Sequence, residues 1–538
     1  MQLETIDVAL VGLYLVVVVA LGLWMSRGVK TGRDLFLGGR SLPWWAVGTS
    51  LVVSDIGAKD MVGLADEGYQ YGLVLTNFDF IGCVFPVLVA AFVFMPYLWM
   101  AGVYTIPEYL GRRYNMGVRT MFALVWGVFM VGTLAVIFVS AATMFENLFG
   151  WNFWTSVVLT AVIVGFYTAI GGLKAVVVTD FVSCIVLIVG AAMICGFGLY
   201  EAGGWSGLQA RIAELPGTEH HFDLLLPADS QSPYSWPAVL LGLGFVLGPA
   251  YWMGNQAIVQ RAFGTRSQEA ARASYVFCAA IKLVFPLLLV VPGLIGLALF
   301  HETLGPPGSD GWQSGSVLPK VVQLLPHGVL GIVLGAFVAG VMSNLDSYVN
   351  SAATLWVTDI YRPFVRPHAT DRECLMVGRI LIVIFMAGGA ASSYVVLQGY
   401  DSVYQAFQTF MSFFQGALLA LLALGMMTRR ATAAGGVAGM IAGIGSAVFM
   451  HTSSVVLAAD NDVWLAGLNV TQLLRGLRPL GFDLADQLNG ISFLWVAWWS
   501  FVVAVAATVI ASALTKPHDE TRLRGLVYWL PMEKEASL

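Results

Sequence analysis

Residues 331–360 read GIVLGAFVAGVMSNLDSYVNSAATLWVTDI. This segment is apolar enough to cross a bilayer, yet its centre carries Asp346 beside Ser343, Asn344 and Ser347. A carboxylate at that depth costs ~2.5–3.5 kcal/mol on insertion scales, so such residues face a bundle interior or a hydrated cavity. The segment therefore indicates a helical membrane protein that handles a polar solute or an ion.

The composition supports this reading for the whole chain. Of 538 residues, 58% are hydrophobic and 11% are charged, whereas soluble domains carry roughly 25% charged residues. We predict an all-α polytopic membrane protein. The net charge of −5 gives no indication of nucleic-acid binding. No HExxH, GxSxG or paired Cys/His motif occurs, so we predict neither an enzyme nor a bound cofactor.

At about 20 residues per span, the apolar runs predict about thirteen transmembrane helices. The spans are expected at 6–26, 44–76 (interrupted), 79–103, 119–147, 152–170, 175–200, 236–260, 272–300, 328–358, 374–398, 403–427, 432–455 and 490–514.

These spans divide the chain into a core of two repeats with peripheral segments. The predicted units are a peripheral N-terminal helix with a cytoplasmic loop (1–43), a first inverted repeat (44–200), an extracellular loop (201–235), a second inverted repeat (236–455), an extracellular loop with peripheral helices (456–515) and a cytoplasmic tail (516–538).

The lysines and arginines give the orientation. Outside the spans, all but Arg211, Lys320, Arg475 and Arg478 fall in alternate loops on one side. Cytoplasmic loops carry the excess of positive charge. We therefore predict a multi-pass protein of the cell (plasma or inner) membrane, with its N-terminus outside and its C-terminus in the cytoplasm.

Two spans are predicted to be broken. Residues 54–72 read SDIGAKDMVGLADEGYQYG, and residues 240–261 read LLGLGFVLGPAYWMGNQAIVQR. Charges and glycines in the first, and Gly248, Pro249 and other glycines in the second, oppose a continuous lipid-facing helix. Paired broken helices in two halves are typical of inverted-repeat transporters with a site near the midplane. The alternative is that these glycines serve only close helix packing.

The residues of these stretches resemble the sodium/solute symporter family, closest to the sodium/glucose cotransporters. The stretches that carry the resemblance are 48–69, 168–180, 250–261, 343–361, 407–427 and 523–529. The resemblance implies a five-plus-five inverted-repeat, leucine-transporter-like core with broken first and sixth core helices. It also implies alternating access, sodium as the coupling ion, and uptake of a small polar solute across the lipid bilayer.

The resemblance further implies a set of sugar-contacting residues. This set is Asp55, Asp60, Asp79, Tyr251, Trp252, Lys282 and Gln408. The last four keep the residue types of the sugar carriers, whereas Asp55 stands where an Asn is usual, Asp60 replaces a His or Gln, and Asp79 replaces a Glu. Carboxylates accept paired hydrogen bonds from neighbouring hydroxyls, and aromatic faces cover the C–H surfaces of sugars.

Each of these assignments has an alternative. Asp55 could pair locally with Lys59, one helical turn on. Lys282 could be a structural counter-ion to Asp79 or Asp60, and Tyr251 could be an inner gate or an ordinary packed aromatic. Three carboxylates facing only two lysines also suit a cationic or amino-bearing solute.

Two cation sites are implied by the same resemblance. The main sodium site would use Val53, Ile56 and Gly340 through their carbonyl oxygens, with the side chains of Ser343 and Asn344. Asn344 departs from the usual Ser; its amide oxygen can still ligate a hard cation but places the ion differently.

A second ion or proton site would use Asp180, Asp346 and Ser347. Two close carboxylates repel, so one would take up a proton or a cation would lie between them. The alternative is that Asp346 only hydrogen-bonds Ser or Asn neighbours.

Together these observations favour a secondary symporter that couples sodium to the uptake of a sugar or polyol. Alternatives are coupling to protons, or a non-sugar solute such as an amino-bearing compound, inositol or proline. A channel or a sensor on the same scaffold is less favoured. A channel should show a continuous polar stripe, whereas the polar residues of this chain gather at the midplane.

Overall fold

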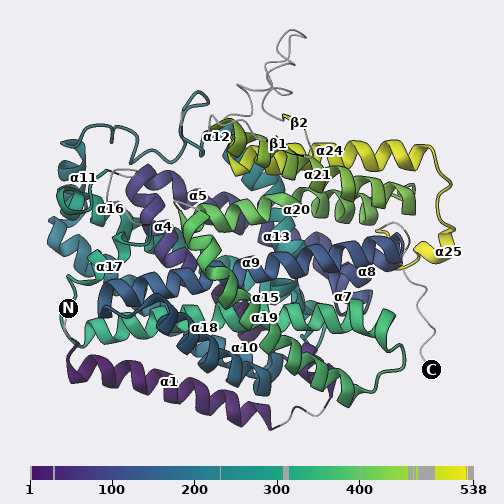
Figure 1. The fold of residues 1–538 in the computed structure, drawn as a ribbon, viewed down its shortest axis with the longest axis horizontal. Helices are drawn as coiled ribbons and strands as arrows, with labels where there is room; N and C mark the ends of the chain where they lie inside the picture. Colours follow the sequence, from purple (N-terminus) through teal and green to yellow (C-terminus); the bar gives the residue numbers. More distant parts are fainter. Residues whose placement is uncertain are drawn as a thin grey trace.

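The computed structural model describes residues 3–306 apart from 28, 30 and 231, then 314–399, 402–458, 464–465, 468–469, 491–528 and 530. Its elements are helices except for one antiparallel pair of two-residue strands, β1 (Trp464–Leu465) and β2 (Leu468–Asn469). The prediction of an all-helical protein is confirmed, and Figure 1 shows the helices packed as one bundle.

The long helices form the body of this bundle. They are α1 (Thr5–Ser26), α9 (Met116–Phe149), α10 (Phe153–Ala202), α16 (Phe285–Leu304), α18 (Val329–Trp356), α19 (Asp371–Gly399), α20 (Val403–Met427), α21 (Ala433–Ala458) and α24 (Phe493–Ala513). In Figure 1, α1 lies along one edge against α10 and α18, whereas α21 and α24 lie at the opposite edge against α20. The core helices are therefore enclosed between peripheral ones.

Eleven helices of the described chain are long and apolar enough to cross a membrane. One of these eleven is the helical segment Ala58–Met100, which covers the end of the span predicted at 44–76 and most of the span predicted at 79–103. This segment is not one straight helix, because Gly72, with a φ of 74°, ends α4 (Ala58–Tyr71) within it. Phe153–Phe166 is a shorter apolar helix. The count of about thirteen spans stays a prediction.

The first predicted break is confirmed. Helix α3 (Trp44–Asp55) ends where Ile56 adopts ψ 121°, and Gly57 is extended before α4 begins. A helix end leaves its last carbonyl groups without intrahelical partners. This break therefore exposes backbone carbonyls in the middle of the bundle, where side chains or ions must satisfy them.

The second break lies slightly later than the glycines suggested. The π-helix η5 (Val239–Leu247) continues into α13 (Gly248–Gly254), and the chain leaves the helix only at Asn255, with ψ 116°. Pro249, which has no amide proton to donate, lies in the first turn of α13, directly after the π-helix. Asn255 Oδ1 then accepts from Ala257 N at 2.9 Å and caps α14 (Gln256–Phe263).

Helix α10 bends at Gly172, where φ is 62°. L-residues with a side chain rarely adopt this conformation. A Cβ atom there would also lie 2.9 Å from Leu35 Cδ1. The bend separates the two spans that the sequence predicted at 152–170 and 175–200.

Helices α4 and α16 cross with their backbones in contact. A Cβ atom at Gly293 of α16 would lie 2.6 Å from Tyr69 N and 2.8 Å from Gly68 C. Both neighbours are backbone atoms, so the crossing cannot adapt by a side-chain rotation. This contact fixes α4, which carries part of the candidate site.

We expect Gly293→Ala to destabilise the fold by about 1–3 kcal/mol, because the added methyl group forces α4 and α16 apart. The measurement is thermal unfolding of the purified protein in detergent. The control is Gly196→Ala on α10, where a Cβ atom would meet nothing within 4 Å. Equal midpoints for the two variants would contradict the assigned role of this crossing.

Candidate functional site

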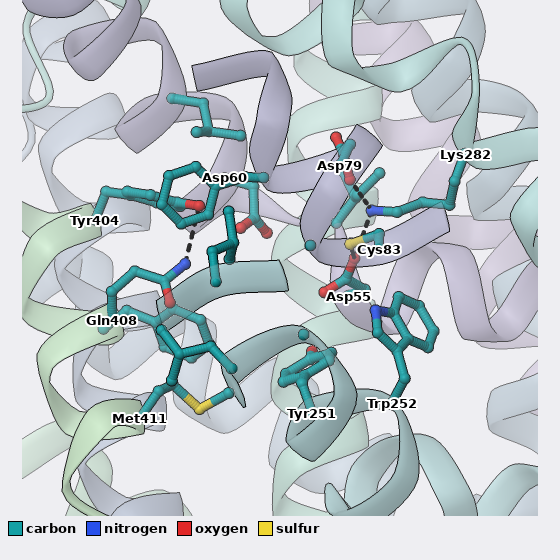
Figure 2. A pocket seen from close by; sticks show the side chains of 18 of the residues that line it. Asp55, Asp60, Asp79, Cys83, Tyr251, Trp252, Lys282, Tyr404, Gln408 and Met411 are labelled. Carbon is teal, nitrogen blue, oxygen red and sulfur yellow. Dashed lines mark hydrogen bonds and ion pairs between the residues drawn. The ribbon is translucent and has the colours of Figure 1, made fainter. Parts of the chain in front are cut away.

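A small cavity of about 60 Å³ lies beside the first break. All seven residues that the resemblance assigned to sugar binding line it: Asp55, Asp60, Asp79, Tyr251, Trp252, Lys282 and Gln408. Figure 2 shows them converging from different helices, with Tyr404 and Gln408 facing the cluster around Lys282. The structure thus brings the whole predicted set together, and its role in substrate binding stays a prediction.

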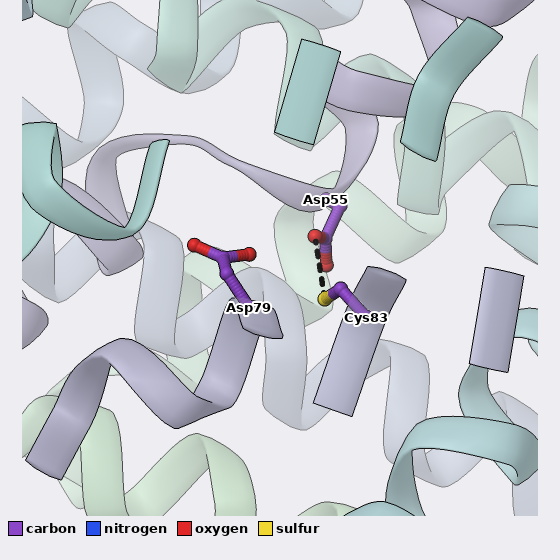
Figure 3. A group of neighbouring side chains, drawn as sticks. All are labelled: Asp55, Asp79 and Cys83. Carbon is purple, nitrogen blue, oxygen red and sulfur yellow. Dashed lines mark hydrogen bonds between the residues drawn. The ribbon is translucent and has the colours of Figure 1, made fainter. Parts of the chain in front are cut away.

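Lys282 is the centre of the first polar cluster. It is the last residue of α15 (Gln268–Lys282), and its Nζ lies 2.5 Å from Asp55 Oδ2 and 2.5 Å from Asp79 Oδ1. The Cys83 thiol lies 3.7 Å from Asp55 Oδ2. Figure 3 shows these two carboxylates and the thiol side by side, and their ligand atoms lie within 4.8 Å of one another. Such a trio could hold a metal, but the Lys282 ammonium already contacts both carboxylates.

Lys59 forms the second cluster. Its Nζ donates to the two carboxylate oxygens of Asp60 at 2.7 and 2.6 Å and to the backbone oxygen of Asp55 at 3.0 Å. It also lies 4.3 Å from the centre of the Phe407 ring. The alternative pairing of the Asp55 and Lys59 side chains does not form in this structure. The helix breaks between the two residues, so their four-residue spacing no longer places them on one face.

Two hydroxyl contacts involve residues of this lining. Gln408 Nε2 donates to Tyr404 Oη at 2.9 Å within α20. The hydroxyl oxygens of Tyr251, on α13, and Tyr348, on α18, lie 3.1 Å apart. The role of Tyr251 as a gate stays a prediction, and sequence reasoning assigned no role to Tyr348 or Tyr404.

The residues of the predicted main sodium site gather at the end of α3. Asn344 Nδ2 donates to Val53 O at 2.9 Å and contacts Ser54 O at 3.3 Å, and Ser343 Oγ lies 3.2 Å from Val53 O. Gly340 packs against the break, since a Cβ atom there would lie 3.1 Å from Gly57 Cα.

The orientation of the Asn344 amide decides whether this donor set fits a hard cation. Asn344 Oδ1 is buried and has no hydrogen-bond partner within the described part of the chain. Amide nitrogen and oxygen are nearly equal in size, so a half-turn of the amide would turn Oδ1 toward the Val53 carbonyl. The residues therefore fit sodium with the amide in that second orientation, in which Asn344 accepts instead of donating.

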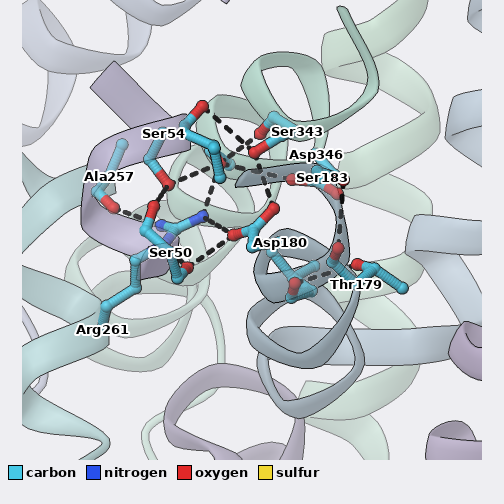
Figure 4. A network of polar contacts seen from close by, with 12 residues as sticks. Ser50, Ser54, Thr179, Asp180, Ser183, Ala257, Arg261, Ser343 and Asp346 are labelled. Carbon is cyan, nitrogen blue, oxygen red and sulfur yellow. Dashed lines mark hydrogen bonds and ion pairs between the residues drawn. The ribbon is translucent and has the colours of Figure 1, made fainter. Parts of the chain in front are cut away.

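Asp180, of the predicted second site, lies in a separate buried network shown in Figure 4. Its carboxylate accepts from Ser50 Oγ at 2.5 Å and from Ser343 Oγ at 2.6 Å. Because Ser343 also contacts Val53, the two predicted cation sites share a hydroxyl group.

Arg261 extends into this network, although the sequence analysis counted it only among the basic residues of the cytoplasmic loops. Its Nη2 lies 3.5 Å from Asp180 Oδ2 and donates to Ser347 Oγ at 2.5 Å, and its Nε donates to Ser50 Oγ at 2.7 Å. Ser347 Oγ also lies 3.3 Å from Asp346 Oδ1. A guanidinium therefore lies beside the carboxylate where a second cation was predicted. The sequence feature that could have indicated this role is the position of Arg261 at the end of the broken stretch 240–261.

Comparisons with known proteins place the whole chain in one group. The model of the sodium:solute symporter family matches residues 35–443. The sodium/glucose cotransporter of Vibrio parahaemolyticus is 30% identical over 536 residues, covering 95% of this chain and 98% of that protein. The rat sodium/glucose cotransporter 2 is 32% identical, with 81% and 70% covered. The human sodium/myo-inositol cotransporter is 29% identical, with 98% and 76% covered.

Solved structures show the same fold. A Na⁺-coupled sialic acid symporter in a substrate-bound outward-open state has a TM-score of 0.78 at 19% identity, covering 96% of this chain and 100% of that one. The nucleobase-cation-symport-1 family transporter Mhp1, in a closed conformation, has a TM-score of 0.51 at 12% identity, with 91% and 96% covered. The predicted leucine-transporter-like fold class is confirmed.

The Arg261–Asp180 contact should behave as one buried unit. We expect Arg261→Gln and Asp180→Asn each to lower stability by about 3–5 kcal/mol, because each leaves an unpaired buried charge. The double variant should recover about 0.5–3 kcal/mol relative to the sum of the singles. Thermal unfolding of all four proteins in detergent measures this.

An exposed ion pair serves as the control for that cycle. Arg429 Nη1 lies 3.0 Å from Glu520 Oε1, with both side chains solvent-accessible, and exposed pairs contribute about 0–1 kcal/mol. Arg429→Gln should therefore change the midpoint little. Strict additivity of the buried pair would show that Arg261 and Asp180 act independently.

Proposed function

The chain belongs to the sodium:solute symporter family, and on this premise we propose that it couples inward sodium movement to the uptake of a sugar or polyol by alternating access. Two observations support the substrate class. The similar sodium/glucose and sodium/myo-inositol cotransporters are named for ring-shaped polyols. The chain also keeps the residue types that the resemblance assigns to sugar carriers at Tyr251, Trp252, Lys282 and Gln408.

The observation that carries the proposal is the convergence of acceptors on one buried cavity. The carboxylates of Asp55, Asp60 and Asp79 and the amide of Gln408 all line it. A polyol offers several hydroxyl donors in a fixed arrangement, which such acceptors bind in the absence of bulk water. The proposed alternating access further implies that the helices around this cavity separate when the solute enters.

Two sets of buried polar contacts join helices of the core. The hydroxyl oxygens of Tyr251 and Tyr348 lie 3.1 Å apart. Glu67 accepts from Tyr234 Oη at 2.7 Å and from Ser402 Oγ at 2.6 Å, joining α4 to the segments before α12 (Trp236–Ala238) and α20. We propose that these two sets of contacts are the two gates and that alternating access breaks one of them at a time.

Sodium would bind at the end of α3, where Val53, Ile56 and Gly340 offer carbonyl oxygens and Ser343 and Asn344 offer side chains. The carbonyl end of a half-helix carries partial negative charge and attracts cations. Asp180, Asp346 and Ser347 form a second candidate site, for an ion or a proton. We propose a cell-membrane location, with the N-terminus outside and the C-terminus in the cytoplasm, from the distribution of basic residues.

Uptake into proteoliposomes tests the proposed function. We expect labelled glucose or myo-inositol to accumulate above equilibrium when sodium is imposed outside, and not when only a proton gradient is imposed. The reason is that a symporter does work only through the ion it binds. Accumulation under the proton gradient alone would reassign the coupling ion, and failure to take up any sugar or polyol would refute the proposed substrate class.

Removing a cavity side chain should reduce this uptake. We expect Gln408→Ala and Lys282→Ala to lower the initial rate by at least about tenfold, corresponding to about 1.4 kcal/mol, because each removes a polar group from the cavity. The Lys282 change also leaves two carboxylates without their shared partner. Gln398→Ala and Lys516→Ala, at exposed positions, are the matched controls. Normal uptake by either cavity variant would show that the site lies elsewhere.

A further inference from the structure

The charges around the cavity do not balance. Three carboxylates, those of Asp55, Asp60 and Asp79, face two ammonium groups, those of Lys59 and Lys282. Arg261, a further buried cation, contacts Ser50, Ser347 and Asp180 in the separate network. The way the two lysines are paired therefore decides where the surplus negative charge lies.

Lys59 and Asp60 neutralise each other. Lys59 Nζ contacts both carboxylate oxygens of Asp60, at 2.7 and 2.6 Å, and takes one backbone carbonyl as a third partner. An ammonium has three protons, so its donors are fully used.

Lys282 is shared between two carboxylates. Its Nζ lies 2.5 Å from one oxygen each of Asp55 and Asp79. One ammonium balances one of these charges, so one negative charge remains at the pair. The Cys83 thiol, which lies against Asp55, brings no positive charge. An enclosed carboxylate is stable when it is paired with a cation or takes up a proton, so this pair requires one more positive charge.

The backbone adds to the negative potential at the same point. Asp55 is the last residue of α3, and the carbonyl end of a helix carries about half a negative charge. This feature is independent of the side-chain count, and it too favours a cation beside Asp55.

The opposite half-helix is closed to anions. The N-terminus of α4 would attract an anionic group of a solute, but Asp60 Oδ2 already accepts from Gly57 N there at 2.9 Å. A second carboxylate would be placed against the first. The protein thus supplies its own anion where a solute carboxylate would bind.

The remaining walls suit an organic cation. Phe78, Tyr251, Trp252, Tyr404 and Phe407 line the cavity, and aromatic faces attract ammonium groups. Lys59 Nζ lies 4.3 Å from the centre of the Phe407 ring, which shows that this wall already accommodates one ammonium.

We propose that the transported solute is a sugar or polyol carrying a protonated amine, and that Asp55 selects it. The ammonium group of the solute contacts Asp55, and Lys282 remains paired with Asp79. Each of these two carboxylates then has its own cation. The hydroxyl groups of the solute face Gln408 and Tyr404. This inference rests on the proposed function and names the substrate class of the same site.

Matched pairs of solutes test the proposal with the full-length protein in proteoliposomes under an inward sodium gradient. One pair is glucosamine against its neutral N-acetyl derivative and glucose; the other is 1-amino-1-deoxysorbitol against sorbitol. We expect each amine to reach half-maximal uptake at a concentration at least about tenfold lower than its neutral partners. Equal or better uptake of the neutral solutes overturns the proposal and leaves the proposed function standing.

The variant Asp55→Asn tests the role of that residue. It places at this position the residue type that the resemblance assigns to glucose carriers, and it should shift preference from the amine toward glucose by a similar factor. Asp229→Asn, on the exposed loop before α12, is the control and should leave the preference unchanged. Thermal unfolding shows whether the Asp55→Asn variant is folded; where it is not, the solute pairs with wild-type protein decide alone.

Two outcomes separate the competing explanations. If the amines gain nothing, and Asp55→Asn instead abolishes a pH dependence in the uptake of neutral sugar, then a proton supplies the missing charge and the proposal fails. If no sugar, polyol or amine is taken up by the wild-type protein, the proposed function itself fails and the inference fails with it.

Discussion

The two-residue interruption between α3 and α4 is the constraint on which the rest of the structure depends. Ile56 and Gly57 leave the helix in the middle of the bundle, and unsatisfied backbone groups are not tolerated in lipid. The surrounding helices supply what is missing: Asn344 donates to Val53 O, Asp60 accepts from Gly57 N, and Lys59 donates to the Asp55 carbonyl. The polar residues of the centre are therefore required by the backbone before any solute is considered.

The same interruption separates the buried charges into independent groups. Lys282 holds Asp55 to Asp79, Lys59 holds Asp60, and Arg261 lies beside Asp180. Lys59 and Asp60 both belong to α4, but Lys282 joins α15 to α3 and Arg261 joins α14 to α10. A relative movement of the joined helices must lengthen or break one of these charged contacts. Breaking a buried pair is costly unless another ion replaces the lost partner. Ion and solute binding thereby become conditions for movement, which is what a coupled carrier requires.

Much of this arrangement could be predicted from the sequence, and the reason differs from part to part. The helical class follows from composition, and the break at Gly57 follows from charges and glycines in an apolar run. The cavity residues came from the family resemblance, because no local pattern shows that Asp79 and Lys282 meet. The pairing of Lys59 with Asp60 was missed because four-residue spacing assumes a continuous helix. Arg261 was missed because its partners lie on three other elements, which only the packed structure brings together.

The last turn of α3 explains how ion and solute can influence each other. Val53 offers its carbonyl to the predicted sodium site, and Asp55, two residues later, offers its side chain to the cavity. A cation at Val53 would turn the Asn344 amide and fix the end of α3, which also fixes the direction of the Asp55 side chain. Conversely, a solute that holds Asp55 restrains the carbonyl at Val53. Coupling through one turn of backbone is reciprocal by thermodynamic necessity, and it requires no contact between the ion and the solute.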